Sequence, residues 1–144
     1  MNISIVDDPY KVIRRAREMY FPVPSRTAET MASQMVYQAL VLGSDEVSAT
    51  KIKEWWIISS KLDWIAARKH TASEVFSSVI PCPEDGPNSH RYEIVVATFA
   101  SAFISIGKEG ETISQGDCRE IQGDLEKCRI QVPGGRILAL QVSS

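Results

Sequence analysis

The chain has 144 residues, of which 44% are hydrophobic and 24% are charged, and its formal net charge at pH 7 is −2. This length predicts a single domain over residues 1–144 that can bury a core without disulfides or a bound metal. Its apolar runs are shorter than the roughly 18 residues that suggest a membrane span, and its acidic N-terminus lacks the pattern of a secretory signal. We therefore expect no contact with a membrane.

Charge is distributed unevenly along the chain. Residues 1–69 carry ten basic and eight acidic side chains, whereas residues 84–126 carry three basic and nine acidic ones. Because nucleic-acid binding depends on Lys and Arg, the acidic segment argues against a nucleic-acid partner. The odd number of cysteines, without short paired spacing, indicates a reducing compartment, and we expect the cytoplasm.

Two helices are predicted at the N-terminus. One of the two aspartates before Pro9 can cap the first helix, and proline suits the first helical position. The prolines of residues 21–24 end that helix. A second helix begins after Ser25 and stops at Gly43, which can adopt a left-handed conformation.

A long third helix is predicted over residues 45–68, and it contains all three tryptophans. At about 100° per residue, Trp55 and Trp56 fall on the apolar half of this helix. Trp64 falls on the opposite half with Ile57, among three cations: Lys53, Lys61 and Arg68. Either the rest of the chain covers this second face, or the face is exposed and binds a partner.

The exposed alternative predicts a protein interface anchored by Trp64 and Ile57. Tryptophan and arginine are enriched among the residues that contribute most to binding energy. The surrounding cations would suit an acidic protein, or the acidic segment of a second copy of this chain.

The middle of the chain is predicted to contain a short helix, a loop and a segment that fits either a helix or a strand. Residues 71–74 form a capping box that opens a short helix, and the three prolines of residues 81–87 indicate a loop. Residues 92–106 fit a helix by length and a strand by their β-branched content, and we favour the helix. If residues 92–106 form a strand instead, residues 107–110, which begin and end with glycine, fit a hairpin turn after it.

The last third of the chain is predicted to form strands, in short segments separated by turns. In residues 127–132 and 136–142, apolar side chains alternate with polar ones. The expected fold class is α+β, with an N-terminal part of three to five helices and a small C-terminal antiparallel hairpin or meander.

The strongest candidate for chemistry is a cysteine in the proline-rich loop of residues 81–87. Cys82, with Asp85 and His90 nearby in sequence, could form a thiol nucleophile and its base, although a buried structural cysteine explains the pattern more simply. The histidines and cysteines lack metal-site spacing, and the glycines do not form a phosphate-binding loop. We therefore expect no metal and no cofactor.

Three functional hypotheses follow. The first is a non-enzymatic protein-binding domain, either a dedicated inhibitor of the immunity or antitoxin type or an assembly adaptor, which acts by steric masking. Its expected contact residues are Ile57, Trp64, Lys53, Lys61 and Arg68. The alternative is a thiol-dependent enzyme that uses Cys82 with His90, and the third hypothesis is a homo-oligomer formed through the Trp64 face.

Overall fold

The computed structural model describes residues 8–65, 69–108 and 111–143. Its strands form one five-stranded antiparallel sheet in the order β1-β2-β5-β3-β4. The strands are β1 (Ser48–Ile52), β2 (Trp55–Ser60), β3 (Ala102–Ile106), β4 (Thr112–Gln115) and β5 (Arg136–Gln141). The last strand in sequence, β5, lies between the β1–β2 and β3–β4 hairpins and joins them into one sheet.

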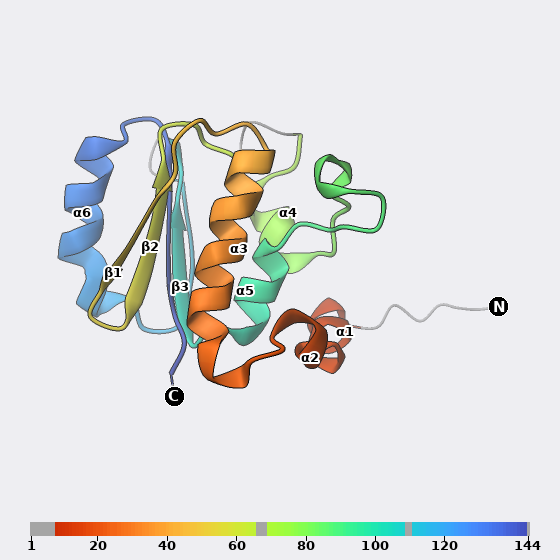
Figure 1. Cartoon of the computed structure of the whole chain (residues 1–144). Helices are drawn as coiled ribbons and strands as arrows, with labels where there is room; N and C mark the ends of the chain where they lie inside the picture. The colour runs from red at the N-terminus through yellow and green to blue at the C-terminus, as the bar shows by residue number, and fades with distance from the viewer. Residues whose placement is uncertain (1–7, 66–68, 109–110, 144) are drawn as a thin grey trace.

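Helices cover both faces of this sheet (Figure 1). Helices α3, α4 and α5 lie on one face, α6 lies on the other, and α1 and α2 lie outside the first helical layer. The helices are α1 (Pro9–Arg15), α2 (Arg17–Tyr20), α3 (Thr27–Val41), α4 (Ala72–Ser77), α5 (Glu93–Phe99) and α6 (Gln122–Gln131), with short 3₁₀ turns η1 (Pro24–Arg26), η2 (Pro83–Asp85) and η4 (Arg119–Ile121). Within the described ranges, no helix combines the length and hydropathy that crossing a bilayer requires.

The predicted mixture of helix and sheet is confirmed, but the predicted division of the chain is not. The sheet is not a small C-terminal addition, because β1 and β2 already occupy residues 48–60. Helices are not confined to the N-terminal part either, since α6 follows β4. Two hydrophobic clusters result, one on each side of the sheet.

The predicted long helix over residues 45–68 is wrong, because residues 48–60 form the β1–β2 hairpin. Successive side chains of β2 point to opposite faces, so Trp55 joins the α6-side cluster and Trp56 packs on the α3 side. Ile52 pairs with Trp55, which leaves a two-residue turn whose first residue, Lys53, has a φ of 56°. Asn-Gly or Asp-Gly usually marks such a turn, and here Lys-Glu gives no such signal.

The C-terminal third was predicted correctly only at its end. β5 is confirmed, with Leu138 and Leu140 buried on the α3 side of the sheet. Residues 127–132 were predicted as a strand, yet most of them belong to α6. Ile130 is 80% exposed there, so the alternating apolar residues of this segment do not form a buried face.

Residues 92–106 contain both of the alternatives that the sequence left open. The first half is helix α5, and the second half is strand β3, with a break near Ala100. β3 then pairs with β4, and the hairpin turn predicted at residues 107–110 lies partly outside the described residues. Residues of α5 pack on the α3 side, whereas Ile104 and Ile106 of β3 face α6.

The predicted helix ends are confirmed at three positions. The Asp8 carboxylate accepts a hydrogen bond from the Tyr10 amide at 2.9 Å and caps α1. Gly43 has a φ of 113° just after α3. Thr71 and Glu74 form both hydrogen bonds of the capping box that starts α4.

A buried ion pair ties β5 to the segment that follows β2. The fully buried Arg136 guanidinium donates to both carboxylate oxygens of Asp63, at 2.9 and 3.0 Å. It also donates to the Ser105 hydroxyl at 3.0 Å and to Glu111 at 3.3 Å. These bonds leave the buried charge well paired, which a buried cation requires.

Candidate functional site

The structure does not bring the predicted contact residues together on an exposed face. Trp64 has an exposed fraction of 0% and lies in the α3-side cluster, whereas Ile57 is buried in the α6-side cluster. Lys53 and Lys61 are exposed, at the hairpin turn and after β2. Arg68 lies outside the described residues. The predicted interface around Trp64 therefore has no basis, because its two apolar anchors lie inside the protein on opposite sides of the sheet.

The residues of the thiol hypothesis lie close in the chain but are not arranged for catalysis. Pro81 and His90 form an isolated antiparallel bridge, and the Cys82 amide donates to the Ser89 carbonyl at 2.9 Å. The Cys82 thiol is buried, and burial raises its pKa above the ordinary value. An activated thiol needs the opposite shift, since the thiolate is the nucleophile.

His90 has other partners. Its Nδ1 lies 2.6 Å from the Arg91 carbonyl oxygen, and its Nε2 lies 2.7 Å from the Tyr20 hydroxyl. Because a carbonyl oxygen can only accept, Nδ1 carries the proton, and in the neutral ring Nε2 accepts from Tyr20. The ring is therefore held by hydrogen bonds that do not involve Cys82.

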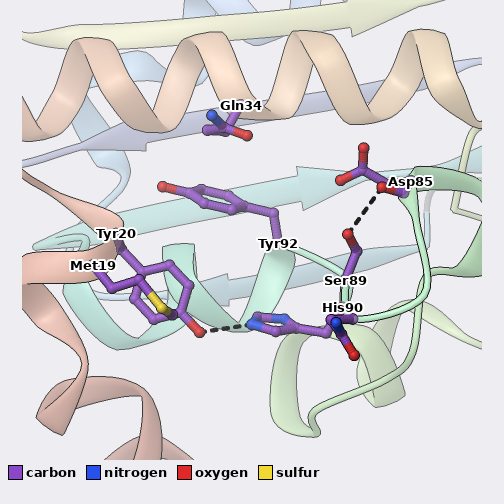
Figure 2. Close-up of a pocket in the computed structure, with 8 residues that line it drawn as sticks. Met19, Tyr20, Gln34, Asp85, Ser89, His90 and Tyr92 are labelled. Carbon is purple, nitrogen blue, oxygen red and sulfur yellow. Dashed lines mark hydrogen bonds between the residues drawn. The ribbon is translucent and has the colours of Figure 1, made fainter.

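A surface hollow of about 260 Å³ lies next to this histidine, between α2, α3 and the loop that precedes α5 (Figure 2). In Figure 2, Met19 and Tyr20 lie on one side of it, Gln34 of α3 lies above, and Asp85 and Ser89 lie on the other side. We call this feature the hollow, and the described residues that line it are Met19, Tyr20, Gln34, Asp85, Asn88, Ser89, His90 and Tyr92.

The loop wall of the hollow is fixed by the loop's own hydrogen bonds. The Ser89 hydroxyl donates to the Asp85 carbonyl at 3.0 Å, and the Ser89 amide donates to the Gly86 carbonyl at 3.3 Å. Gly86 adopts a φ of 122°, which is unfavourable for residues with a side chain. At the loop's end, the Arg91 amide donates to the Ile80 carbonyl at 2.7 Å.

The floor of the hollow is fixed by a buried polar network. The Gln38 side chain accepts from the Tyr92 amide at 2.6 Å and donates to Glu93 at 2.7 Å. Glu93 in turn accepts two hydrogen bonds from the Arg91 guanidinium, at 3.2 and 2.7 Å. Both charged groups are almost fully buried, so this pair holds Tyr92 and the start of α5 against α3.

Aromatic rings meet nearly at right angles in the hollow. The Tyr20 and Tyr92 ring centroids are 6.5 Å apart with an interplanar angle of 76°, and the Tyr20 and His90 rings are 5.8 Å apart at 72°. Tyr92 is 9% exposed, and its hydroxyl has no hydrogen-bond partner within the part of the chain described. Burial raises the pKa of both tyrosines, so both phenols stay neutral near pH 7.

Large side chains stand exposed beside the hollow. Met19, which lines it, is 70% exposed, and Tyr37 of α3 is 51% exposed. The Tyr37 hydroxyl donates to the Asp85 carboxylate, and this bond with the negative charge raises the Tyr37 pKa. Leu40, three residues further along α3, is also largely exposed, and residues at this spacing lie on one side of a helix.

The hollow was not predicted from the sequence. Met19 and Tyr20 lie in the first predicted helix, and neither they nor Gln34 and Tyr92 stand out as functional residues in the sequence. The one usable signal was the loop, because a stretch with prolines, a glycine and a histidine that is too long for a simple turn often carries function.

Each thiol or phenol discussed here has a pKa raised from its ordinary value, so none is activated as a nucleophile. Within the described ranges, no group of three or more His, Cys, Asp or Glu side chains is placed to hold a metal ion. The hollow itself is preformed and has exposed apolar side chains at its edge.

Comparison with protein-family models, with curated proteins and with solved structures gives no match for this chain. The fold and the hollow therefore define only a class: a mixed helix-and-sheet protein with a fixed, aromatic-lined surface site.

Proposed function

We propose that this protein is a non-enzymatic protein-binding domain whose contact surface is the hollow together with Met19 and Tyr37 beside it. It acts by covering a surface of its partner, as an inhibitor of the immunity or antitoxin type or an assembly adaptor does. This proposal keeps the functional class expected from the sequence and moves the contact surface from Trp64 to the hollow.

One observation carries the proposal: Met19 is 70% exposed at the edge of a hollow whose walls are already fixed. An exposed methionine adapts to an apolar partner surface, and tyrosine supplies a rigid contact area that loses little entropy on binding. Because the walls are already ordered before a partner binds, binding does not incur the entropy cost of ordering them. The raised pKa of Cys82 favours this function over a thiol-dependent enzyme.

The three cysteines support a reducing compartment, such as the cytoplasm, as the place of action. Cys82, Cys118 and Cys128 are all free thiols, and the first two are buried. Free thiols are typical of compartments in which glutathione and thioredoxin keep cysteines reduced.

Site-specific photo-cross-linking tests the proposal. A photo-reactive amino acid is placed at position 19, and in a matched protein at position 130 on α6. Ile130 is 80% exposed on the other side of the sheet, so it controls for an exposed apolar position of similar reactivity. We expect irradiation of producing cells to give a discrete covalent adduct from position 19 and none from position 130.

The opposite pattern contradicts the proposal. An adduct from position 130 with none from position 19 would place the contact surface on α6. Equal, diffuse labelling from both positions would show that neither side binds a specific partner.

A further inference from the structure

The hollow has an unbalanced charge. Of its described lining residues, Asp85 alone carries a carboxylate, and none is a lysine or an arginine. The Tyr37 hydroxyl satisfies part of the hydrogen-bonding capacity of Asp85, but a carboxylate accepts several hydrogen bonds. A group that enters the hollow and complements this charge is therefore cationic.

The walls favour a flat cation. The rings of Tyr20, Tyr92 and His90 meet nearly at right angles and offer both ring faces and ring edges. Cations bind over the negative face of an aromatic ring. The chain uses this contact itself, because the Arg17 guanidinium lies 5.1 Å from the Phe99 ring centroid and 5.8 Å from that of Phe21.

Arginine fits this environment better than lysine. Its planar guanidinium can stack on tyrosine while its five N–H donors reach a carboxylate and neighbouring amide oxygens, here Asp85 and Gln34. Lysine has a compact, strongly hydrated charge that gains less from stacking. The volume of about 260 Å³ is below the roughly 300–1,000 Å³ of small-molecule sites, which suits a single side chain.

We infer that the hollow receives an arginine side chain of the partner protein, with the guanidinium paired to Asp85 and packed against the Tyr20 and Tyr92 rings (Figure 2). This inference rests on the proposed function, because it names the chemistry by which the same surface recognises its partner. It also reverses the charge expected of the partner: the contact made here is with a basic group, not an acidic one.

The test uses the whole protein and a defined probe, N-acetyl-arginine N-methylamide, followed by ¹H–¹⁵N NMR. The matched probe is the citrulline compound, which has nearly the same shape and no charge. We expect arginine to shift the amide signals of Met19, Ser89 and His90 in a saturable way, with binding at least about tenfold tighter than citrulline, a difference of about 1.4 kcal/mol. The corresponding lysine compound should bind more weakly than arginine.

Two variants localise the effect. Asp85→Asn keeps the shape of an exposed side chain and should lose most of the arginine binding. Glu126→Gln, on α6 across the sheet, changes the net charge equally and should bind arginine as the wild type does.

Several results would overturn the inference. These are equal binding of citrulline or lysine, shifts outside the hollow, arginine binding that survives in Asp85→Asn, or no saturable shift at all. Because the titration needs no partner, it is independent of the cross-linking test. An adduct from position 19 with no arginine binding would leave the contact surface in place and remove only its proposed chemistry.

Discussion

Trp64 and Met19 show two ways in which a large apolar side chain can be placed in this protein. Trp64 follows β2 and has an exposed fraction of 0%, enclosed in the cluster between the sheet and α3. Met19 belongs to the four-residue helix α2, outside the first helical layer, and is 70% exposed. The comparison leads to two expectations. Substitutions in the region after β2 should lower stability, whereas substitutions at the exposed edge of the hollow, which we propose binds a partner, should leave the protein folded.

The surroundings of the two regions explain this difference. The segment after β2 is held by the buried Asp63–Arg136 pair and joins the central strands of the sheet. The hollow is lined by α2, α3 and a loop, whose positions depend on the network of Gln38, Arg91 and Glu93 beneath it. Substitutions in that network would alter both stability and binding, whereas substitutions at the edge should alter binding alone.

The largest expected effect comes from Trp64→Ala. Removing a fully buried indole leaves a cavity and should lower the free energy of unfolding by about 3–5 kcal/mol, or unfold the protein. Urea denaturation followed by circular dichroism measures this loss, and Trp64→Phe should lose less. A Trp64→Ala protein as stable as the wild type would mean that the ring does not contribute to the core.

Asp63→Asn should have an intermediate effect. The buried Arg136 would lose its charged bidentate partner but keep its contacts with Ser105 and Glu111. We therefore expect a loss of about 2 kcal/mol in the free energy of unfolding, measured in the same way. The control is Asp117→Asn, which breaks the exposed pair with Arg119 and should leave the urea midpoint unchanged; an equal loss in both variants would contradict the structural role of the buried pair.

Local signals in the sequence predicted local structure well. The Asp8 cap, the Thr71 capping box and the alternating residues of β5 involve hydrogen bonds or periodicities within a few residues, and all three were predicted. The hairpin at residues 48–60 was missed because its Lys-Glu turn lacks the usual glycine. Its two tryptophans also fit one face of a helical wheel as readily as the two faces of a strand.

The hollow could not be predicted in the same way. It brings together residues as far apart in sequence as Met19 and Tyr92, and their proximity follows from long-range contacts such as the Tyr20–His90 hydrogen bond. The burial of Trp64 has the same origin, because it depends on the sheet and on α3. The predicted interface required Trp64, Ile57 and the cations to share one face of a helix. Residues 48–60 form a hairpin instead, so these residues do not share a face.

The smallest expected effect on stability is that of Met19→Ser, and it provides the most direct test of the central claim. The side chain is mostly in solvent, so the free energy of unfolding should stay within about 0.5 kcal/mol of the wild type. The measurement is the yield of covalent adduct from a photo-reactive amino acid at position 37, compared with and without Met19→Ser. The account predicts that the adduct is lost while the protein stays folded; an undiminished adduct in the stable Met19→Ser protein would show that the hollow and its edge are not the contact surface.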